Sequence, residues 1–249
     1  MIRHRPGSLS ILVLCALVSL GLAAPVLAGS IFGRVLFSDE IPAEGTGPFR
    51  PVDMTDFPHC EGKYEKPMTN GTLVLGKRKG LSNVFVRIRN APAGRYNAPR
   101  KAEVIDQTGC VCVPRVVGVR VDQPLVFRNS DRIHYSLEGL PSKNPRFNFE
   151  MPPTLAERVI RFDKAELSPF VIRDKRHPWR VAFVAVMTHP FFDVTRETGW
   201  FKIRNVPDGE YVIEAWHETL GTRRATVTID EDSDAKIDFR FEIPDAKAG

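Results

Sequence analysis

Long apolar stretches are scarce in this 249-residue chain, and the one that occurs lies at its start. Arg3 and Arg5 precede an apolar run at 11–26, which ends in Val26-Leu27-Ala28, a sequence typical of a signal-peptidase site. The run is too short to make a good membrane-spanning helix. We therefore expect residues 1–28 to be a signal peptide, and the mature protein to be secreted without a transmembrane segment.

An excess of one charge is also missing. The chain has 35 Lys and Arg against 30 Asp and Glu, and Arg3 and Arg5 leave with the signal peptide, so 33 − 30 gives a mature net charge of +3. Nucleic-acid-binding domains are usually much more basic and carry clustered Lys and Arg. We expect no nucleic-acid partner.

The common catalytic motifs are absent too. The sequence contains no phosphate-binding Gly-rich loop, no His-Glu-x-x-His and no Gly-x-Ser-x-Gly. His189 and the pair His217-Glu218 could suggest hydrolysis, but neither has an activated nucleophile or a third orienting group beside it in the sequence. We predict that the protein is not an enzyme.

Amphipathic helical patterns are lacking after the signal peptide. Short alternating apolar runs recur instead between Pro, Gly, Asn and Asp clusters, which indicates an all-β fold. Val181–Thr188 is almost wholly apolar, as expected of a central strand that is buried on both faces.

We divide the mature chain into residues 29–79, a strand followed by a long irregular segment, a domain at 80–187, and a module at 188–249. This last module contains only about five expected strands, which is marginal for a free-standing sandwich. We therefore predict that Ser30–Phe37 pairs into its sheet, so that 80–187 is an insertion.

Cysteine is rare, and three remain after the signal peptide: Cys60, Cys110 and Cys112. An oxidising compartment favours one disulfide. Cys110 and Cys112 are only two residues apart and would pair poorly with each other. We prefer Cys60–Cys110, which would tie the irregular segment to the sandwich, and which leaves Cys112 as a buried thiol or an intermolecular contact.

Two sets of motifs carry a family resemblance. The first set consists of Asn83-Val-Phe-Val-Arg-Ile88, Asp106-Gln-Thr-Gly-Cys-Val-Cys-Val-Pro114, Asn129-Ser-Asp131 with His134, and Asp174-x-x-His177-Pro-Trp-Arg180. It resembles periplasmic cupredoxin-like proteins. The second set consists of His189-Pro190, Thr198-Gly199-x-Phe201, Val206-Pro-x-Gly209-x-Tyr211 and Trp216-His217-Glu218. It resembles carboxypeptidase-regulatory-like, transthyretin-type modules.

Similar bacterial chains, some called methylamine-utilisation proteins, carry the two modules in this order. The resemblance implies a cupredoxin-like Greek-key β-sandwich followed by a smaller prealbumin-type β-sandwich, located in the bacterial periplasm.

The resemblance also points to a copper site that is incomplete in this chain. His134 and His177 match the two histidine ligands, but Asp174 stands in the place of the copper cysteine and Arg180 in that of the methionine. A blue-copper (type 1) centre depends on thiolate ligation, so we expect none here. His134, His177 and Asp174 could still bind Cu(II) or Zn(II), or the histidines could serve packing alone.

Four cations surround this loop: Arg173, Lys175, Arg176 and Arg180. They would repel a divalent metal and attract an anion, or they could form an ordinary solvated rim. The three tryptophans, Trp179, Trp200 and Trp216, could stack on a sugar, but aromatic residues at alternating strand positions more often lie in a core.

The leading functional hypothesis is a secreted, non-enzymatic binding or assembly module that lacks the blue-copper cysteine and methionine. Its partner would be a periplasmic protein or an anionic or glycan ligand, and no cofactor is expected. One alternative is copper binding or electron transfer through His134 and His177. Another is carbohydrate binding by the C-terminal module.

Overall fold

The computed structural model describes residues 28–231 and 233–244. The predicted signal peptide lies outside these residues, except for Ala28. In the described part no helix has the length and apolarity needed to cross a membrane. The all-β prediction is confirmed, because the chain is built from short strands and its only α-helix there is α1 (Pro58–Glu61).

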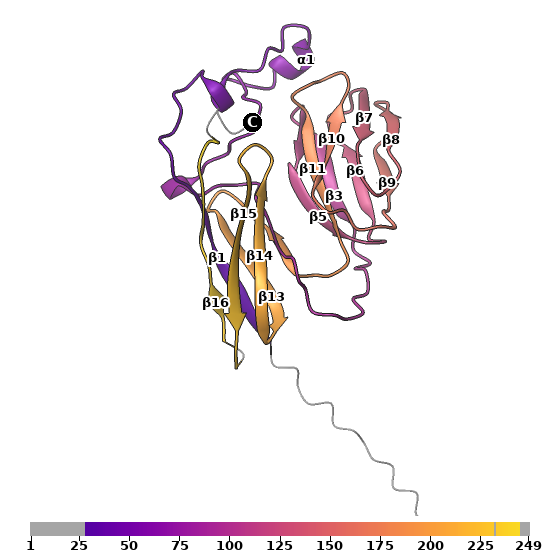
Figure 1. The fold of residues 1–249 in the computed structure, drawn as a ribbon. Helices are drawn as coiled ribbons and strands as arrows, with labels where there is room; N and C mark the ends of the chain where they lie inside the picture. The colour runs from indigo at the N-terminus through magenta and orange to yellow at the C-terminus, as the bar shows by residue number, and fades with distance from the viewer. Residues whose placement is uncertain (1–27, 232, 245–249) are drawn as a thin grey trace, which may run out of the picture.

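Two β-sandwiches lie side by side (Figure 1). The first packs one sheet of order β5-β11-β10-β7-β8 against another of order β4-β3-β6-β9. Its strands are β3 (Glu103–Thr108), β4 (Val111–Val113), β5 (Val116–Arg120), β6 (Leu125–Asn129), β7 (Tyr135–Gly139), β8 (Phe147–Met151), β9 (Glu157–Ile160), β10 (Phe170–Asp174) and β11 (Val181–Met187). Side chains from both sheets fill one core, which includes Phe127, Leu137 and Val184.

Strand β11 is buried on both faces, as its apolar sequence predicts. Ala182, Val184 and Val186 point into the core of the first sandwich. Ala185 and Met187 point the other way and pack against the second sandwich. The strand therefore joins the two cores.

The second sandwich combines the two ends of the chain. One sheet has the order β13-β1-β16, with β17 also paired to β1, and the other has the order β12-β2-β14-β15. The strands are β1 (Ala28–Phe37), β2 (Phe85–Ile88), β12 (Phe192–Val194), β13 (Trp200–Pro207), β14 (Gly209–His217), β15 (Gly221–Ile229), β16 (Ala235–Lys236) and β17 (Phe239–Phe241). Strand β1 pairs antiparallel with β13, so Ser30–Phe37 is part of the C-terminal sheet, as predicted.

Strand β2 belongs to the second sandwich and not to the inserted one. The sequence placed it in the domain at 80–187, but it is hydrogen-bonded between β12 and β14 in the second sandwich. Val84, Val86 and Ile88 are buried in that core. The alternating pattern identified a strand correctly but carried no information about its partner, so the inserted sandwich begins at β3.

The irregular segment at 38–79 crosses from the second sandwich to the first, where α1 lies above the strands (Figure 1). The predicted Cys60–Cys110 disulfide is confirmed. Both cysteines pack with Met54 and Trp179 in a small core of their own. Cys112 is a buried free thiol, which is one of the two alternatives that the sequence left open for it.

Candidate functional site

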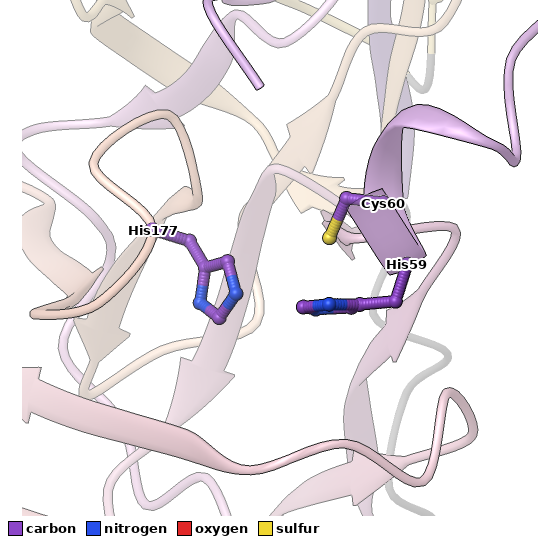
Figure 2. Close-up of side chains that lie close together, drawn as sticks. All are labelled: His59, Cys60 and His177. Carbon is purple, nitrogen blue, oxygen red and sulfur yellow. The ribbon is translucent and has the colours of Figure 1, made fainter. Parts of the chain in front are cut away.

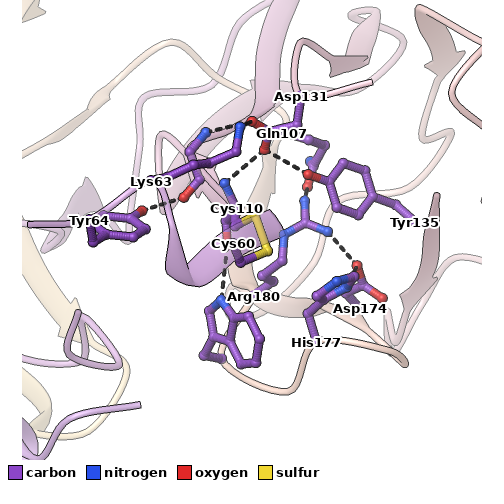
Figure 3. Close-up of a disulfide and its surroundings, with 12 residues drawn as sticks. Cys60, Lys63, Tyr64, Gln107, Cys110, Asp131, Tyr135, Asp174, His177 and Arg180 are labelled. Carbon is purple, nitrogen blue, oxygen red and sulfur yellow. Dashed lines mark hydrogen bonds and ion pairs between the residues drawn. A yellow bond between two sulfur atoms is a disulfide. The ribbon is translucent and has the colours of Figure 1, made fainter. Parts of the chain in front are cut away.

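A buried arginine is the centre of the β10–β11 loop region. Arg180 is fully buried, and its guanidinium group forms an ion pair with Asp174 and donates a hydrogen bond to Gln107. Its Cζ atom lies 3.3 Å from the ring centroid of Tyr135. Figure 3 shows this network beside the disulfide. The interior of the loop region thus already contains a cation.

Asp174 holds the loop together. Its Oδ1 accepts the backbone amide of Arg176 at 2.8 Å, and its Oδ2 lies 3.0 Å from Nδ1 of His177. Burial alone would raise the pKa of Asp174, but the hydrogen bond to His177 and the charge of Arg180 lower it below its ordinary value. Asp174 is therefore ionised and neutralises Arg180.

The predicted surface of four cations needs correction. Arg180 is inside the protein, so it cannot meet a ligand at the surface. Arg173 and Lys175 both lie near the carboxylate of Glu138, at 2.8 and 3.6 Å. Glu138 sits on β7, directly opposite Arg173 on β10. Local counting of charges could not find this cross-strand partner.

The predicted metal ligands are not brought together as one set. His134 is exposed, and its Nε2 lies 2.7 Å from Glu150. His177 is buried and contacts Asp174, whose Oδ2 is shared with Arg180. Asp174 is thus held between a histidine and an arginine, with its second oxygen on a backbone amide.

A different group of side chains surrounds His177. Over the described residues, the only cluster of three or more potential ligands with mutual distances within 4.8 Å is His59, Cys60 and His177. The rings of His59 and His177 have centroids 5.9 Å apart. The sequence analysis missed His59, because nothing in Pro58-His59-Cys60 shows that α1 folds back over a loop more than 110 residues later.

An open groove of about 1200 Å³ lies between the two sandwiches. Residues of β4, β5 and β12 line it. Each of these strands is the last strand of its sheet. Apolar side chains from the irregular segment and from the β10–β11 loop, Met68 and Trp179, complete the wall. Three strand edges therefore border one partly apolar groove.

The tryptophans are divided between core and surface. Trp179 is buried and donates a hydrogen bond to the carbonyl of Cys110 at 3.0 Å, and Trp216 packs against Phe183. Trp200 is 47% exposed and stacks on Phe32. The preference for core positions is thus wrong for Trp200, which lies on the outer face of β13.

His217 and Glu218 have structural contacts. Glu218 forms an ion pair with Arg115 of the first sandwich, so it links the two sandwiches. His217 is buried, and its Nδ1 accepts the backbone amide of Leu220 at 3.3 Å. Burial, and then the charge of Arg115, lower the pKa of His217 to about 4. A neutral His217 orders the turn between β14 and β15.

No known family model matches the chain. Solved structures that are similar to it include a copper-containing nitrite reductase from Thermus scotoductus, with 16% identity, a TM-score of 0.31, and coverage of 39% of this chain and 25% of the reductase. An amicyanin variant in its Cu(I) form has 14% identity and a TM-score of 0.31, over 41% of this chain and 98% of amicyanin. A purple cupredoxin from Nitrosopumilus maritimus has 16% identity and a TM-score of 0.29, over 34% and 99%. Nothing about function follows from likeness at this level.

Proposed function

We propose that this chain is a secreted, non-enzymatic binding or assembly protein whose first sandwich is a scaffold without a type 1 copper site. One observation carries the proposal: the Arg180 guanidinium fills the interior beside Asp174 and His177. Arg180 and His177 share Oδ2 of Asp174 and the backbone amide of Arg176 is on Oδ1, so this carboxylate is not free to bind a metal, and removal of Arg180 would leave its charge unpaired. The loop therefore serves the stability of the scaffold.

The groove between the sandwiches is the binding surface in this proposal, and its occupant is an extended polypeptide segment of another secreted protein. Strand edges present rows of backbone N–H and C=O groups, to which an extended chain can add as a further strand. The groove has three such edges, and apolar side chains beside them can take alternate side chains of the bound segment.

A lysine in the groove is expected to weaken peptide binding. Val113 lies on β4 and is 47% exposed in the groove, so Val113→Lys places a charge where an apolar side chain would dock. Peptides selected from a displayed random library on the mature protein should lose at least about tenfold in affinity for this variant, a loss of about 1.4 kcal/mol. Fluorescence anisotropy with labelled synthetic peptides measures it.

Val159→Lys is the matched control, because Val159 is 56% exposed on β9, at the opposite end of the same sheet. It should bind like the wild type. Hydrogen exchange of the complex should show protection of amides in β4, β5 or β12. Equal peptide affinity of both variants, or protection confined to other strands, would contradict the groove as the binding surface.

Copper loading tests the scaffold part of the proposal. The β10–β11 loop contains no thiol, and Cys60 and Cys110 are joined in a disulfide. The intense visible band of blue copper requires a Cu–thiolate bond in a site of two histidines and one cysteine. We expect no such band when the disulfide-bonded protein is titrated with Cu(II). An intense band with one equivalent of copper would contradict the proposal.

A further inference from the structure

Three potential metal ligands converge beneath the irregular segment. His59 and Cys60 project from α1, and His177 projects from the β10–β11 loop toward them (Figure 2). One ligand atom from each lies within 4.8 Å of the other two. Ligands of a tetrahedral zinc ion, bound at about 2.0–2.3 Å, lie roughly 3 to 4 Å apart. His59 is exposed, so its side chain has room to change its rotamer.

The buried histidine carries an unused nitrogen. His177 is 3% exposed, and its Nε2 has no hydrogen-bond partner among the described residues. Buried polar atoms without a partner are uncommon, because they lose their hydration without compensation. Its other nitrogen, Nδ1, faces the ionised Asp174 at 3.0 Å. A carboxylate in this position keeps the proton on Nδ1, so Nε2 presents a lone pair to the cluster.

This arrangement gives Asp174 a different role from the one that the sequence suggested. Histidine ligands of metals usually donate their second N–H to a carboxylate or a carbonyl, which fixes the tautomer and the ring orientation. Asp174 lies in that outer position, behind His177. Its contact with Arg180 also cancels the charge of the guanidinium, which would otherwise oppose a cation nearby.

The segment that contains α1 is itself acidic. Residues 53–61 contain Asp53, Asp56 and Glu61 and no Lys or Arg. Phe57 and Trp179 pack on the ring of His177, with centroids at 4.7 and 5.4 Å, and they shield one side of the cluster from water. Apolar walls strengthen the attraction of a bound cation to its ligands.

We propose that His59 and His177 form a binding site for a thiophilic d10 ion, Zn(II) or Cu(I), and that Cys60 becomes its third ligand when the Cys60–Cys110 disulfide is reduced. A dithiol is the reductant. It gives two electrons and two protons to the S–S bond, which becomes two thiols, while the dithiol closes to its own cyclic disulfide. The Cys60 thiol then loses its proton to solvent as the metal–sulfur bond forms.

Two imidazoles and a thiolate suit such ions much better than two imidazoles alone, because thiolate is a soft, charged ligand. The site therefore responds to the redox state of the protein: it is weak with the disulfide intact and strong after reduction. His134 has no part in it.

Zinc titration of the mature protein tests this site. One sample is kept oxidised. The other is reduced with a dithiol, which is then removed by desalting, and is kept under anaerobic conditions. Competition with a chromogenic chelator should show one Zn(II) bound at least about tenfold more tightly by the reduced protein, which is about 1.4 kcal/mol. Cys112 is a buried thiol in both samples, so its contribution cancels.

Substitutions assign the ligands. His59→Ala should weaken Zn(II) binding by reduced protein at least about tenfold, and because His59 is exposed, its fold should be unchanged. His134→Ala, an exposed histidine paired with Glu150, should bind like the wild type. Cys110→Ser should bind tightly without any reductant, since its Cys60 is a free thiol, and its Co(II) form should show thiolate-to-cobalt absorption.

Two results would overturn the proposal. Wild-type affinity in reduced His59→Ala would remove the site. Equal affinity of oxidised and reduced wild-type protein would remove Cys60 as the third ligand and with it the redox response. Both readings use proteins whose folding is checked independently by circular dichroism.

Discussion

Replacing Arg180 by methionine is expected to lower the free energy of unfolding by about 3–5 kcal/mol. The substitution introduces an apolar side chain of similar length and leaves the ionised carboxylate of Asp174 buried without its cation. Gln107 loses the donor to its side-chain oxygen as well. Urea denaturation followed by tryptophan fluorescence measures the change.

The matched control is Arg173→Met on the same strand. Arg173 is also paired with a carboxylate, that of Glu138, but more than half of its side chain is exposed. Exposed ion pairs contribute little to the free energy of unfolding, so the control variant should be almost as stable as the wild type. The double variant Asp174→Asn with Arg180→Met should recover much of the loss, because neither charge is then left alone. A loss for Arg180→Met as small as that for Arg173→Met would contradict the role of the buried pair.

Removing the disulfide is also expected to lower the free energy of unfolding strongly. Cys60 and Cys110 are separated by 50 residues in the sequence. Closing a loop of this length lowers the entropy of the unfolded chain, which is worth about 4 kcal/mol. We expect Cys60→Ala with Cys110→Ala to lose stability of this order, measured by urea denaturation without reductant, and α1 to become sensitive to limited proteolysis.

Cys112→Ala is the control for this pair. This variant removes a buried thiol but no cross-link. Its free energy of unfolding should therefore fall only by the effect of a small cavity, about 1 kcal/mol. Unfolding midpoints that fall equally in the two proteins would show that the cross-link adds nothing beyond the packing of its sulfur atoms.

The sequence was informative where a feature depends on local pattern. The alternation of apolar residues predicted the all-β fold. The cysteine spacing argued against a Cys110–Cys112 bond, and the preferred pairing, Cys60–Cys110, is confirmed. The shortage of strands after residue 188 predicted the pairing of Ser30–Phe37 with the C-terminal sheet. Each of these follows from composition, period or simple counting.

The sequence was uninformative where the outcome depends on a distant partner. Strand β2 has the same period-two pattern in either sandwich, so its membership was not visible. Arg180 was counted as a surface charge because Asp174 and Gln107 could not be placed around it. His59 belongs to an irregular segment, and only the folded chain brings it next to His177.

The arrangement of the two sandwiches also constrains the order in which they can form during synthesis. Strands β3 to β11 lie within residues 103–187, so every ladder of the first sandwich is available before β13 has been made. Strand β1 is made first, yet its antiparallel partner β13 begins at Trp200. Until β13 is available, β1 has an unpaired edge of the kind that attracts unwanted pairing. This strand is therefore most exposed to wrong pairing before Trp200 and the residues after it have emerged.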